Sequence, residues 1–434
     1  MAETFGDRVK RRDVVVGVVG LGYVGLPLSI AFAESGFRTV GFDADPERAS
    51  ALNRGFSHID DVTSDRVAAM VAAGSFQALS SVEALHADAI FICVPTPFDK
   101  AKTPDLSFVR SATGTVAEIL RPGMLVILQS TTYPGTTTEI VQPLLERDGL
   151  RAGIDFHLAF SPERVDPGNA EWTVHNTPKV VGGLTSACTD AARALLEAVM
   201  DHPGLVHTVG SPAAAEMAKL LENTYRAVNI ALVNELAMLA HEMDINTWEV
   251  IDAAATKPFG FEAFYPGIGP GGHCIPVDPH YLSWKAREFD FQTKFIEVSA
   301  DVNSGMARYV VSRVQDLMNR HGRAFNGARV LCLGAAFKPG VSDIRNSRAI
   351  RVMELIEEAG AHVEYIDEHV PMVSLRSGER KSYPLSDAAH ADFDVAVVLV
   401  AGSQWPLAEL DEAGIPVFDA VNAGGGGGRL RESL

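Results

Sequence analysis

A glycine-rich turn of the form Gly-x-Gly-x-x-Gly, made by Gly20, Gly22 and Gly25, stands between the apolar run 14–19 and a helical pattern. Such glycines let the backbone turn tightly and approach a pyrophosphate, whose charge the N-terminus of the next helix stabilises. Asp43 closes the following apolar run, where an acid accepts ribose hydroxyls and repels a 2′-phosphate. The motif predicts an α/β domain that binds NAD; a tight turn without a ligand is the alternative.

Overall charge and hydropathy exclude several kinds of partner. The 434 residues carry a formal net charge of -18, whereas nucleic acids and anionic membranes need basic patches. No stretch approaches the roughly 20 apolar residues that cross a bilayer, and the polar start 1–13 has no apolar signal core after it. We therefore expect a cytoplasmic protein of two or three domains that binds neither nucleic acid nor membrane.

Short apolar runs alternate with helical patterns in the first half of the chain and again near its end, which predicts parallel sheets with helices on both faces. The expected strands are 14–19, 38–43, 89–94, 125–129, 157–160 and 180–182, then 329–333, 362–367, 394–400 and 417–419. Between the two halves, Ser211 and Pro212 begin a stretch that predicts one long helix to Asp244. The glycine run 424–428 suggests a flexible tail.

Cys274 is the cysteine that a loop displays. It stands among glycines and prolines in 271–276, where no apolar periodicity packs it. Cys93 and Cys332 lie in apolar runs and are expected to be core thiols, and Cys188 fits an ordinary helix position. Cys274 is therefore the candidate for covalent chemistry.

The long helix carries a polar stripe. Glu216, Lys219, Asn223 and Arg226 are spaced by three or four residues and so share one side of the helix. They could line a cleft, or they could be the wet face of an amphipathic helix. The stripe decides nothing without Cys274.

A displayed cysteine beside a nicotinamide site can carry an alcohol past the aldehyde. The thiolate of Cys274 would attack the aldehyde, the thiohemiacetal would be oxidised, and water would cleave the resulting thioester. Lys219 and Asn223 could stabilise the oxyanions, while Asp278 or Glu163 could manage protons through a water. A metal held by His273, Cys274, Asp278 and His280 is a competing interpretation, opposed by the crowding of these side chains in one loop.

Seven blocks, in order along nearly the whole chain, resemble the UDP-glucose/GDP-mannose dehydrogenase family of nucleotide-sugar 6-dehydrogenases. They are 20–27 (GLGYVGLP), 91–97 (FICVPTP), 130–136 (STTYPGT), 161–168 (SPERVDPG), 216–226, 269–281 (GPGGHCIPVDPHY) and 334–345. The stretches 161–169 and 258–269 look closest to the branch that oxidises UDP-N-acetylglucosamine.

The resemblance implies roles for individual residues. Cys274 matches the nucleophile, Lys219 and Asn223 the oxyanion pair, Asp278 and Thr131 the holders of the catalytic water, and Glu163 a glutamate of thioester turnover. The cofactor would be bound by Gly20, Gly22, Tyr23, Val24, Gly25, Asp43, Arg48, Thr96, Thr131 and Arg345. The substrate would be bound by Glu163, Arg164, Lys219, Asn223, Tyr265, Gly267, Gly271, Phe337 and Lys338. From position alone, Arg48 could contact adenosine or merely cap a helix.

The family's fold has two Rossmann-like, doubly wound domains joined by the long central helix, which also builds a homodimer, with the active site between the domains. The implied division is 1–210 for NAD, 211–320 for the helical dimerisation part with the catalytic residues, and 321–434 for the nucleotide of a UDP-sugar. The product would be a uronic acid for polysaccharide biosynthesis. The sequence departs from the family pattern at two positions. The arginine that commonly follows the last strand and binds the nucleotide is absent after Asp419, where Arg429 could substitute. Arg348 stands where proline is frequent.

Two rival functions use the same first domain. A two-electron 3-hydroxyacid or sugar-acid dehydrogenase would use Lys219 and Asn223 but would not need Cys274. A catalytically silent sensor of NAD or nucleotide sugar would need none of these three residues. Counting NADH separates them, because the thioester route releases two per substrate, the rival dehydrogenase one and the sensor none.

Overall fold

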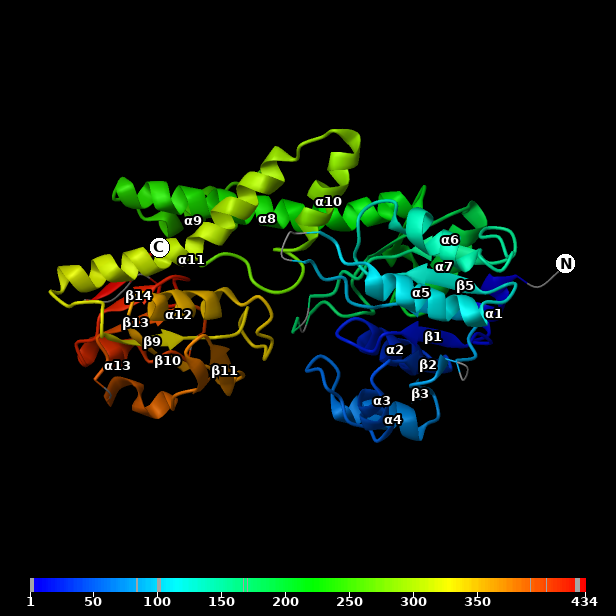
Figure 1. The fold of residues 1–434 in the computed structure, drawn as a ribbon, viewed down its shortest axis with the longest axis horizontal. Coiled ribbons are helices and arrows are strands. Elements are labelled where there is room, and N and C mark those ends of the chain that lie inside the picture. Colours follow the sequence, from blue (N-terminus) through cyan, green and yellow to red (C-terminus); the bar gives the residue numbers. More distant parts are fainter. Residues whose placement is uncertain are drawn as a thin grey trace. The chain divides into compact units, whose positions relative to one another are not determined.

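The computed structural model describes residues 4–82, 85–99, 103–166, 168–169, 171–390, 392–402, 404–425 and 430–434. The chain forms two compact units. Unit 1 comprises Met1–Glu222 and Trp284–Phe291, and unit 2 comprises Asn223–Ser283 and Gln292–Leu434. Each unit contains its own predominantly parallel sheet with helices packed on it (Figure 1), as the α/β prediction requires.

Unit 1 contains an eight-stranded sheet in the order β3-β2-β1-β4-β5-β6-β7-β8. Its strands are β1 (Val16–Val19), β2 (Thr39–Phe42), β3 (Phe76–Leu79), β4 (Ala89–Ile92), β5 (Leu125–Leu128), β6 (His157–Phe160), β7 (Lys179–Gly183) and β8 (Val206–Val209). Neighbours run parallel except β6 and β7, which pair antiparallel. The six strands predicted for this half are confirmed. We missed β3 and β8, which are only partly buried and so form no apolar run.

Several helices of unit 1 start at a residue whose side chain caps them. They are α1 (Phe5–Lys10), α2 (Gly25–Glu34), α3 (Pro46–Asn53), α4 (Ser64–Ala72), α5 (Ser107–Ile119), α6 (Gln142–Leu145) and α7 (Ser186–Glu197), with the π-helical turn η2 (Thr137–Val141) before α6 and the short η3 (Pro203–Leu205). Asp45, Thr63 and Thr185 cap α3, α4 and α7. Apolar residues of α2, α4 and α7 share one buried core with β1, β4 and β5, which fixes the sheet edge where the candidate site lies.

The long helix α8 (Pro212–Glu242) confirms the prediction, and the hydroxyl of Ser211 caps it by accepting the amide of Ala214 at 3.2 Å. Three more helices follow: α9 (Thr247–Ala255), α10 (Asp278–Ala286) and α11 (Lys294–Arg320), with the short η4 (Arg287–Phe289) between the last two. We did not foresee α9. Among the described residues, no helix is both long enough and apolar enough to cross a bilayer.

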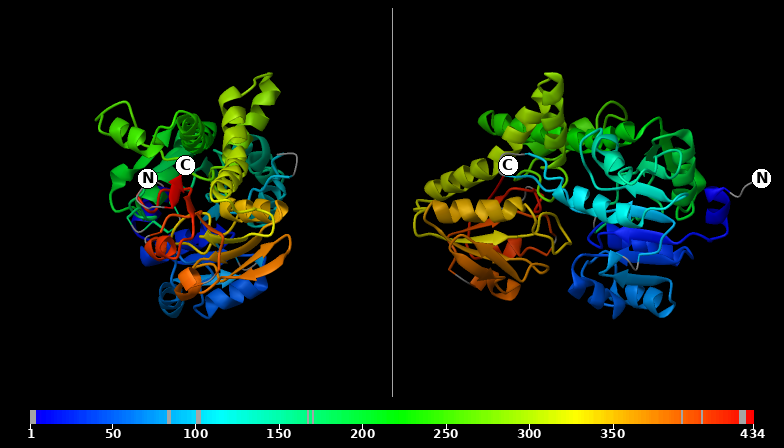
Figure 2. Two further views of the ribbon diagram at one scale, coloured as in Figure 1. Left: turned by 90° about the vertical axis from the view of Figure 1, so that its left-hand side faces the viewer. Right: turned by 45° about the vertical axis from the view of Figure 1, so that its right-hand side comes forward.

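Unit 2 contains a five-stranded parallel sheet in the order β10-β9-β13-β14-β15 and a separate antiparallel hairpin. The strands are β9 (Arg329–Leu333), β10 (His362–Ile366), β13 (Val395–Val398), β14 (Val417–Asp419) and β15 (Arg431–Ser433), with β11 (Met372–Leu375) and β12 (Gly378–Lys381) in the hairpin. Apolar residues of α11 and α12 (Arg348–Glu358) share one core cluster with this sheet. A second cluster joins α13 (Leu407–Glu412) and the short η5 (Leu385–His390) to the alternate residues of the same strands. The ribbon of this unit accordingly has helices on both faces of its sheet (Figure 2).

The end of the chain corrects one expectation. We predicted a flexible tail from the glycine run 424–428, of which 426–428 lie outside the described residues, but β15 comes after the run and pairs with β14, with Phe418 opposite Glu432. Arg431 pairs with Asp411 at 3.1 Å. The chain therefore returns to the sheet after the glycines, whereas Arg429, a candidate for the nucleotide contact, lies outside the described residues.

Candidate active site

The turn after β1 has the geometry that a dinucleotide pyrophosphate requires. Gly20 has a φ of +93°, and a Cβ on it would lie 2.5 Å from the carbonyl oxygen of Cys93; a Cβ on Gly25 would lie 1.8 Å from the carbonyl oxygen of Gly20. A Cβ on Gly22 would meet no described atom within 4 Å. The outer glycines therefore shape the turn, and the middle one leaves its backbone open, as the predicted pyrophosphate contact requires.

Asp43 lies directly after β2, with its carboxylate held at that turn. Its two oxygens accept the amides of Leu21 and Asp45, both at 3.0 Å. Nη1 of Arg48 donates to both oxygens, at 3.2 and 3.0 Å. Because the guanidinium of Arg48 is engaged with Asp43, and Asp45 caps α3, the idea that Arg48 merely caps this helix is wrong. Its contact with adenosine stays a prediction.

The other predicted cofactor residues of unit 1 follow the carboxyl ends of three neighbouring strands. Tyr23 and Val24 come after β1, Thr96 after β4 and Thr131 after β5. Open α/β sheets bind ligands at this edge. Thr96 is buried, Thr131 is half-buried and Tyr23 is 38 % exposed, so these segments suit a cofactor site.

The polar stripe on α8 points mostly inward. Glu216, Lys219 and Asn223 are buried, and only Arg226 is exposed. The wet-face interpretation is therefore wrong for the first three residues. Buried polar groups need partners, and the structure provides them for Glu216 and Asn223.

Glu216 fastens α8 to the loop that follows β5. Its carboxylate accepts the amide of Gly135 at 2.6 Å, and the amide and hydroxyl of Thr137 at 2.9 and 2.6 Å. Burial raises the pKa of Glu216 although these donors oppose the shift. The bonds hold the helix, one turn before Lys219, against the segment that contains Thr131.

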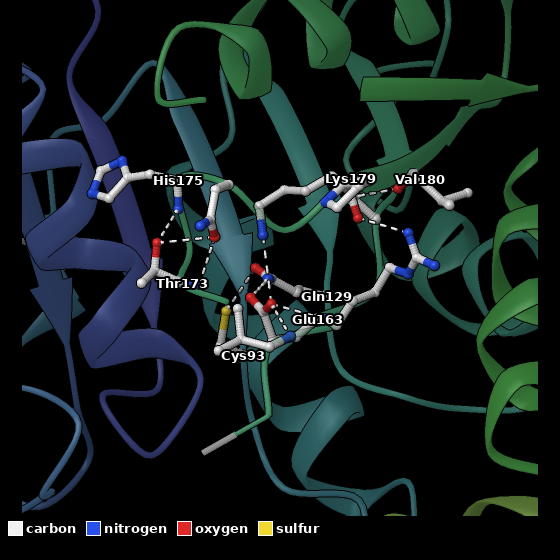
Figure 3. A network of polar contacts seen from close by, with 12 residues as sticks. Cys93, Gln129, Glu163, Thr173, His175, Lys179 and Val180 are labelled. Carbon is white, nitrogen blue, oxygen red and sulfur yellow. Dashed lines mark hydrogen bonds and ion pairs between the residues drawn. The ribbon is translucent and has the colours of Figure 1, made fainter. Parts of the chain in front are cut away.

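Glu163, in the segment after β6, lies within a network of hydrogen-bond donors (Figure 3). Two of its neighbours, Gln129 and Lys179, are residues that we had not selected from the sequence. The sequence signal that could have identified them is a polar residue next to an apolar strand: Gln129 follows the end of β5, and Lys179 begins β7. Arg164, predicted to bind substrate, pairs with Glu222 of α8 at 2.9 Å.

In unit 2, Asn223 and Asp278 form one buried pair. Nδ2 of Asn223 donates to Oδ2 of Asp278 at 2.5 Å, and both residues are 4 % exposed. The amide of Asp278 also donates to the carbonyl oxygen of Cys274 at 2.8 Å. Residues 55 positions apart in sequence are thereby joined, and one of them is bonded to the backbone of Cys274.

Cys274 is exposed, unlike Cys93, Cys188 and Cys332, which are buried. The thiol that sequence reasoning selected is therefore the accessible one among the four. Burial lowers the pKa of the preceding His273, and the nearby Arg345 lowers it further, so this imidazole is neutral near pH 7. Among the described residues, no group of three or more His, Cys, Asp or Glu side chains is placed to hold a metal.

The cysteine loop is fastened to the loop after β9. The amide of Gly272 donates to the carbonyl oxygen of Arg345 at 3.1 Å, and Nδ2 of Asn346 donates to that of Gly272 at 3.1 Å. Nε of Arg348 donates to the carbonyl oxygen of Pro270 at 3.3 Å. Arg348, which stands where the family frequently has proline, thus helps to anchor this loop.

Close packing reinforces the anchor. A Cβ on Gly271 would come within 2.9 Å of Cβ of Phe337, and a Cβ on Gly272 within 3.0 Å of its ring. A larger side chain in place of Gly271 would displace Cβ of Phe337, and one in place of Gly272 would displace its ring. The packing explains the two adjacent glycines without recourse to a ligand.

The remaining predicted substrate and cofactor residues of unit 2 have structural partners. Tyr265 stacks on Trp248 and donates to Asp252 at 2.8 Å, and the amide of Gly267 donates to Asn234 at 2.9 Å. Lys338 lies 5.8 Å from the ring centroid of Phe337, and Arg345 pairs with Asp343. Their ligand contacts stay predictions.

A cofactor turn at the carboxyl edge of a parallel sheet, together with a second α/β unit, defines the class of dinucleotide-dependent oxidoreductases with two Rossmann-like domains. Residues 14–200 match the NAD binding domain of the UDP-glucose/GDP-mannose dehydrogenase family, residues 213–305 its central domain and residues 331–421 its UDP binding domain. The chain belongs to this family and is an NAD-dependent oxidoreductase. The division at 210 and 320 stays a prediction.

Relatives with known names are similar over nearly the whole chain. The UDP-N-acetyl-D-glucosamine 6-dehydrogenase of Pseudomonas aeruginosa is 37% identical over 91% of this chain and 92% of its own. The UDP-N-acetyl-D-mannosamine dehydrogenase of Pyrococcus horikoshii is 37% identical over 82% and 84%. The solved structure of UDP-D-ManNAc dehydrogenase from Pyrococcus horikoshii has a TM-score of 0.88 at 31% identity, covering 97% of this chain and 99% of that one.

Proposed function

We propose that this enzyme oxidises the C6 alcohol of a UDP-hexose to the carboxylate through a thiohemiacetal and a thioester on Cys274. The observation that carries the proposal is the exposed thiol of Cys274 on an anchored loop, directly joined to the buried pair of Asn223 and Asp278. A two-electron dehydrogenase needs no such thiol. Bound NAD, held by the turn 20–25 and by Asp43, supplies the hydride acceptor for both oxidations.

The residues of the chain have separate tasks in this proposal. The sulfur of Cys274 forms a bond to the aldehyde carbon and is released when water replaces it, so the enzyme is regenerated. Nδ2 of Asn223 and the ammonium of Lys219 donate to the oxyanions of the tetrahedral species. Asp278, fixed by Asn223, orients a water, as does the hydroxyl of Thr131. Phe337 and Lys338 hold the nucleotide.

UDP-N-acetylglucosamine is the sugar nucleotide that we propose as substrate. The stretches 161–169 and 258–269 favour it, and one relative of 37% identity bears that substrate in its name. An equally similar relative is named for the C2 epimer, UDP-N-acetyl-D-mannosamine. The two must be compared directly.

The test is a panel of UDP- and GDP-sugars scored for NADH release and for acid by mass spectrometry. We expect two NADH per acid with UDP-N-acetylglucosamine, and no net acid from Cys274→Ser. One NADH per substrate, or an unimpaired Cys274→Ser variant, would refute the covalent route. A faster reaction with the C2 epimer would refute only the choice of sugar.

We also propose a homodimer formed through α8. Large apolar side chains recur every three to seven residues along it and are exposed, among them Leu221, Tyr225, Leu232, Leu236 and Leu239. Such a stripe on a soluble enzyme suits burial against a second copy. Light scattering of Leu236→Lys should give a smaller species than wild type. The predicted cytoplasmic location is testable by cell fractionation.

A further inference from the structure

Every hydrogen-bond or ion-pair partner that the described residues are seen to give the carboxylate of Glu163 is a donor. Oε1 accepts the amides of Arg164 and Val165 at 2.8 and 2.9 Å, and the ammonium of Lys179 lies 3.5 Å from it. Nε2 of Gln129 donates to Oε2 at 2.8 Å. Hydrogen bonds from amides and from an ammonium stabilise a charged carboxylate more than a neutral carboxyl, so the surroundings favour the ionised form.

A buried thiol fixes the orientation of Gln129. The sulfur of Cys93 donates to Oε1 of Gln129 at 3.4 Å, and burial raises the pKa of this thiol far above its usual range, so that it keeps its proton. With its oxygen engaged by the thiol, the amide must turn its NH₂ group toward Glu163 (Figure 3). Cys93 is thus more than core filling.

Lys179 begins β7 and is 1% exposed, and Glu163 is the one ion-pair partner that the described residues give it. A buried ammonium is stable only beside an anion. Burial alone would raise the pKa of Glu163, but Lys179, the two backbone amides and Lys219 bring it below the ordinary value. The lysine therefore counterbalances the burial of the carboxylate.

We propose that Lys179, together with Gln129, is a positioning residue that keeps Glu163 ionised so that it acts as the base in thioester hydrolysis. The inference rests on the proposed function. Oε2 accepts a single described hydrogen bond and Glu163 is 14% exposed, which leaves this oxygen a lone pair for water. Gln129 aims the carboxylate and Lys179 sets its charge.

The step balances without a further reactant. As the water oxygen bonds to the thioester carbon, Glu163 takes one water proton. The C–S bond then breaks and the thiolate of Cys274 leaves. The carboxylic acid product loses its proton to solvent, and Glu163 returns the other proton to the thiolate or to solvent. No electrons change hands in this step.

The test compares Lys179→Met with Lys179→Arg, which keeps the charge. In Lys179→Met, Glu163 protonates at higher pH, so the acid limb of kcat moves to higher pH. We expect kcat at pH 7 to fall about 10- to 100-fold, with KM for both substrates little changed. Hydrolysis would become limiting, so rapid mixing should show a burst of two NADH per site, and intact mass should show sugar on Cys274. Lys179→Arg should restore most of the rate.

Two further variants keep the test decisive if Lys179→Met folds poorly. Gln129→Met removes the other side-chain donor to Glu163 and should shift the acid limb of kcat in the same direction by a smaller amount. Lys285→Met removes a different buried lysine, paired with Glu139 and Glu288, and should lower stability without moving the acid limb. An unmoved limb in both Lys179→Met and Gln129→Met, without a covalent adduct, overturns the inference.

The wild-type enzyme separates this failure from failure of the proposed function. If wild type releases two NADH per acid and depends on Cys274 while the Lys179 variants behave normally, only the positioning role is wrong. If wild type releases one NADH, the covalent route itself is wrong.

Discussion

The two α/β units repeat one turn and then use it differently. In unit 1 the amide of Gly20 donates to the carbonyl oxygen of Phe42 at 2.8 Å; in unit 2 the amide of Gly334 donates to that of Ile366 at 2.8 Å. Both glycines have positive φ, +93° and +96°. After the first, α2 begins at Gly25; after the second, α12 begins only at Arg348.

The aspartate after the second strand of each unit shows what this difference does. In unit 2 the carboxylate of Asp367 accepts four backbone amides, from Ala335, Ala336, His369 and Val370, at 2.8–3.1 Å. In unit 1 Asp43 accepts two amides and one side chain, that of Arg48. Main-chain partners cannot leave and a side chain can. Asp367 is therefore a structural clamp, whereas Asp43 has a side-chain partner that a ribose could replace, as the cofactor role predicted for Asp43 requires.

The largest expected effect is on the turn itself. Gly20→Ala would place a Cβ 2.5 Å from the carbonyl oxygen of Cys93, and Gly334→Ala one 2.4 Å from Cβ of Val400. We expect each to cost about 3 kcal/mol or more of folding free energy, because backbone must move. Hydrogen exchange should show each loss in its own unit. Wild-type exchange in Gly20→Ala would contradict a shared turn geometry.

The two aspartates should separate stability from cofactor binding. Asp367→Asn puts an NH₂ group against backbone amides and should cost about 2–3 kcal/mol of unfolding free energy, leaving KM for NAD unchanged. Asp43→Asn should lose less stability but raise KM for NAD about tenfold and weaken the preference over NADP. Denaturant unfolding and steady-state kinetics measure both. Equal stability losses would contradict the distinction between a structural role for Asp367 and a cofactor-binding role for Asp43.

Gly22→Ala should affect the ligand and spare the fold. Its Cβ would enter open space, so stability should change by less than about 1 kcal/mol. The same Cβ would stand where a pyrophosphate approaches, and we expect KM for NAD to rise about tenfold. A thermal melt serves as the control. An unchanged KM would mean that the pyrophosphate lies elsewhere.

Arg48→Ala should have the smallest effect. The Arg48 side chain is 37% exposed, and ion pairs as exposed as this contribute below about 1 kcal/mol. If a ribose simply replaces Arg48 as the partner of Asp43, KM for NAD should change by less than about threefold. A change as large as that of Asp43→Asn would place Arg48 on the cofactor itself.

Much of the fold was predictable because its signals are local. The apolar runs gave all ten expected strands, and the absence of glycine and proline after Pro212 gave α8. We missed the hairpin of β11 and β12 and the edge strands β3, β8 and β15. These strands are partly exposed to solvent, so their apolar patterns are weak. The glycine run before β15 actively misled, because the low complexity of a segment does not determine whether the residues after it form a strand.

The sequence by itself determined the NAD turn, the displayed Cys274 and the polar stripe of α8, because each depends on residues close together in the chain. Only the tertiary structure decided what those groups contact. It joined Asn223 to Asp278, Glu216 to the loop at 135–137, and Lys179 to Glu163. Charge and orientation in a buried site come from neighbours brought there by packing, and a linear pattern does not record them.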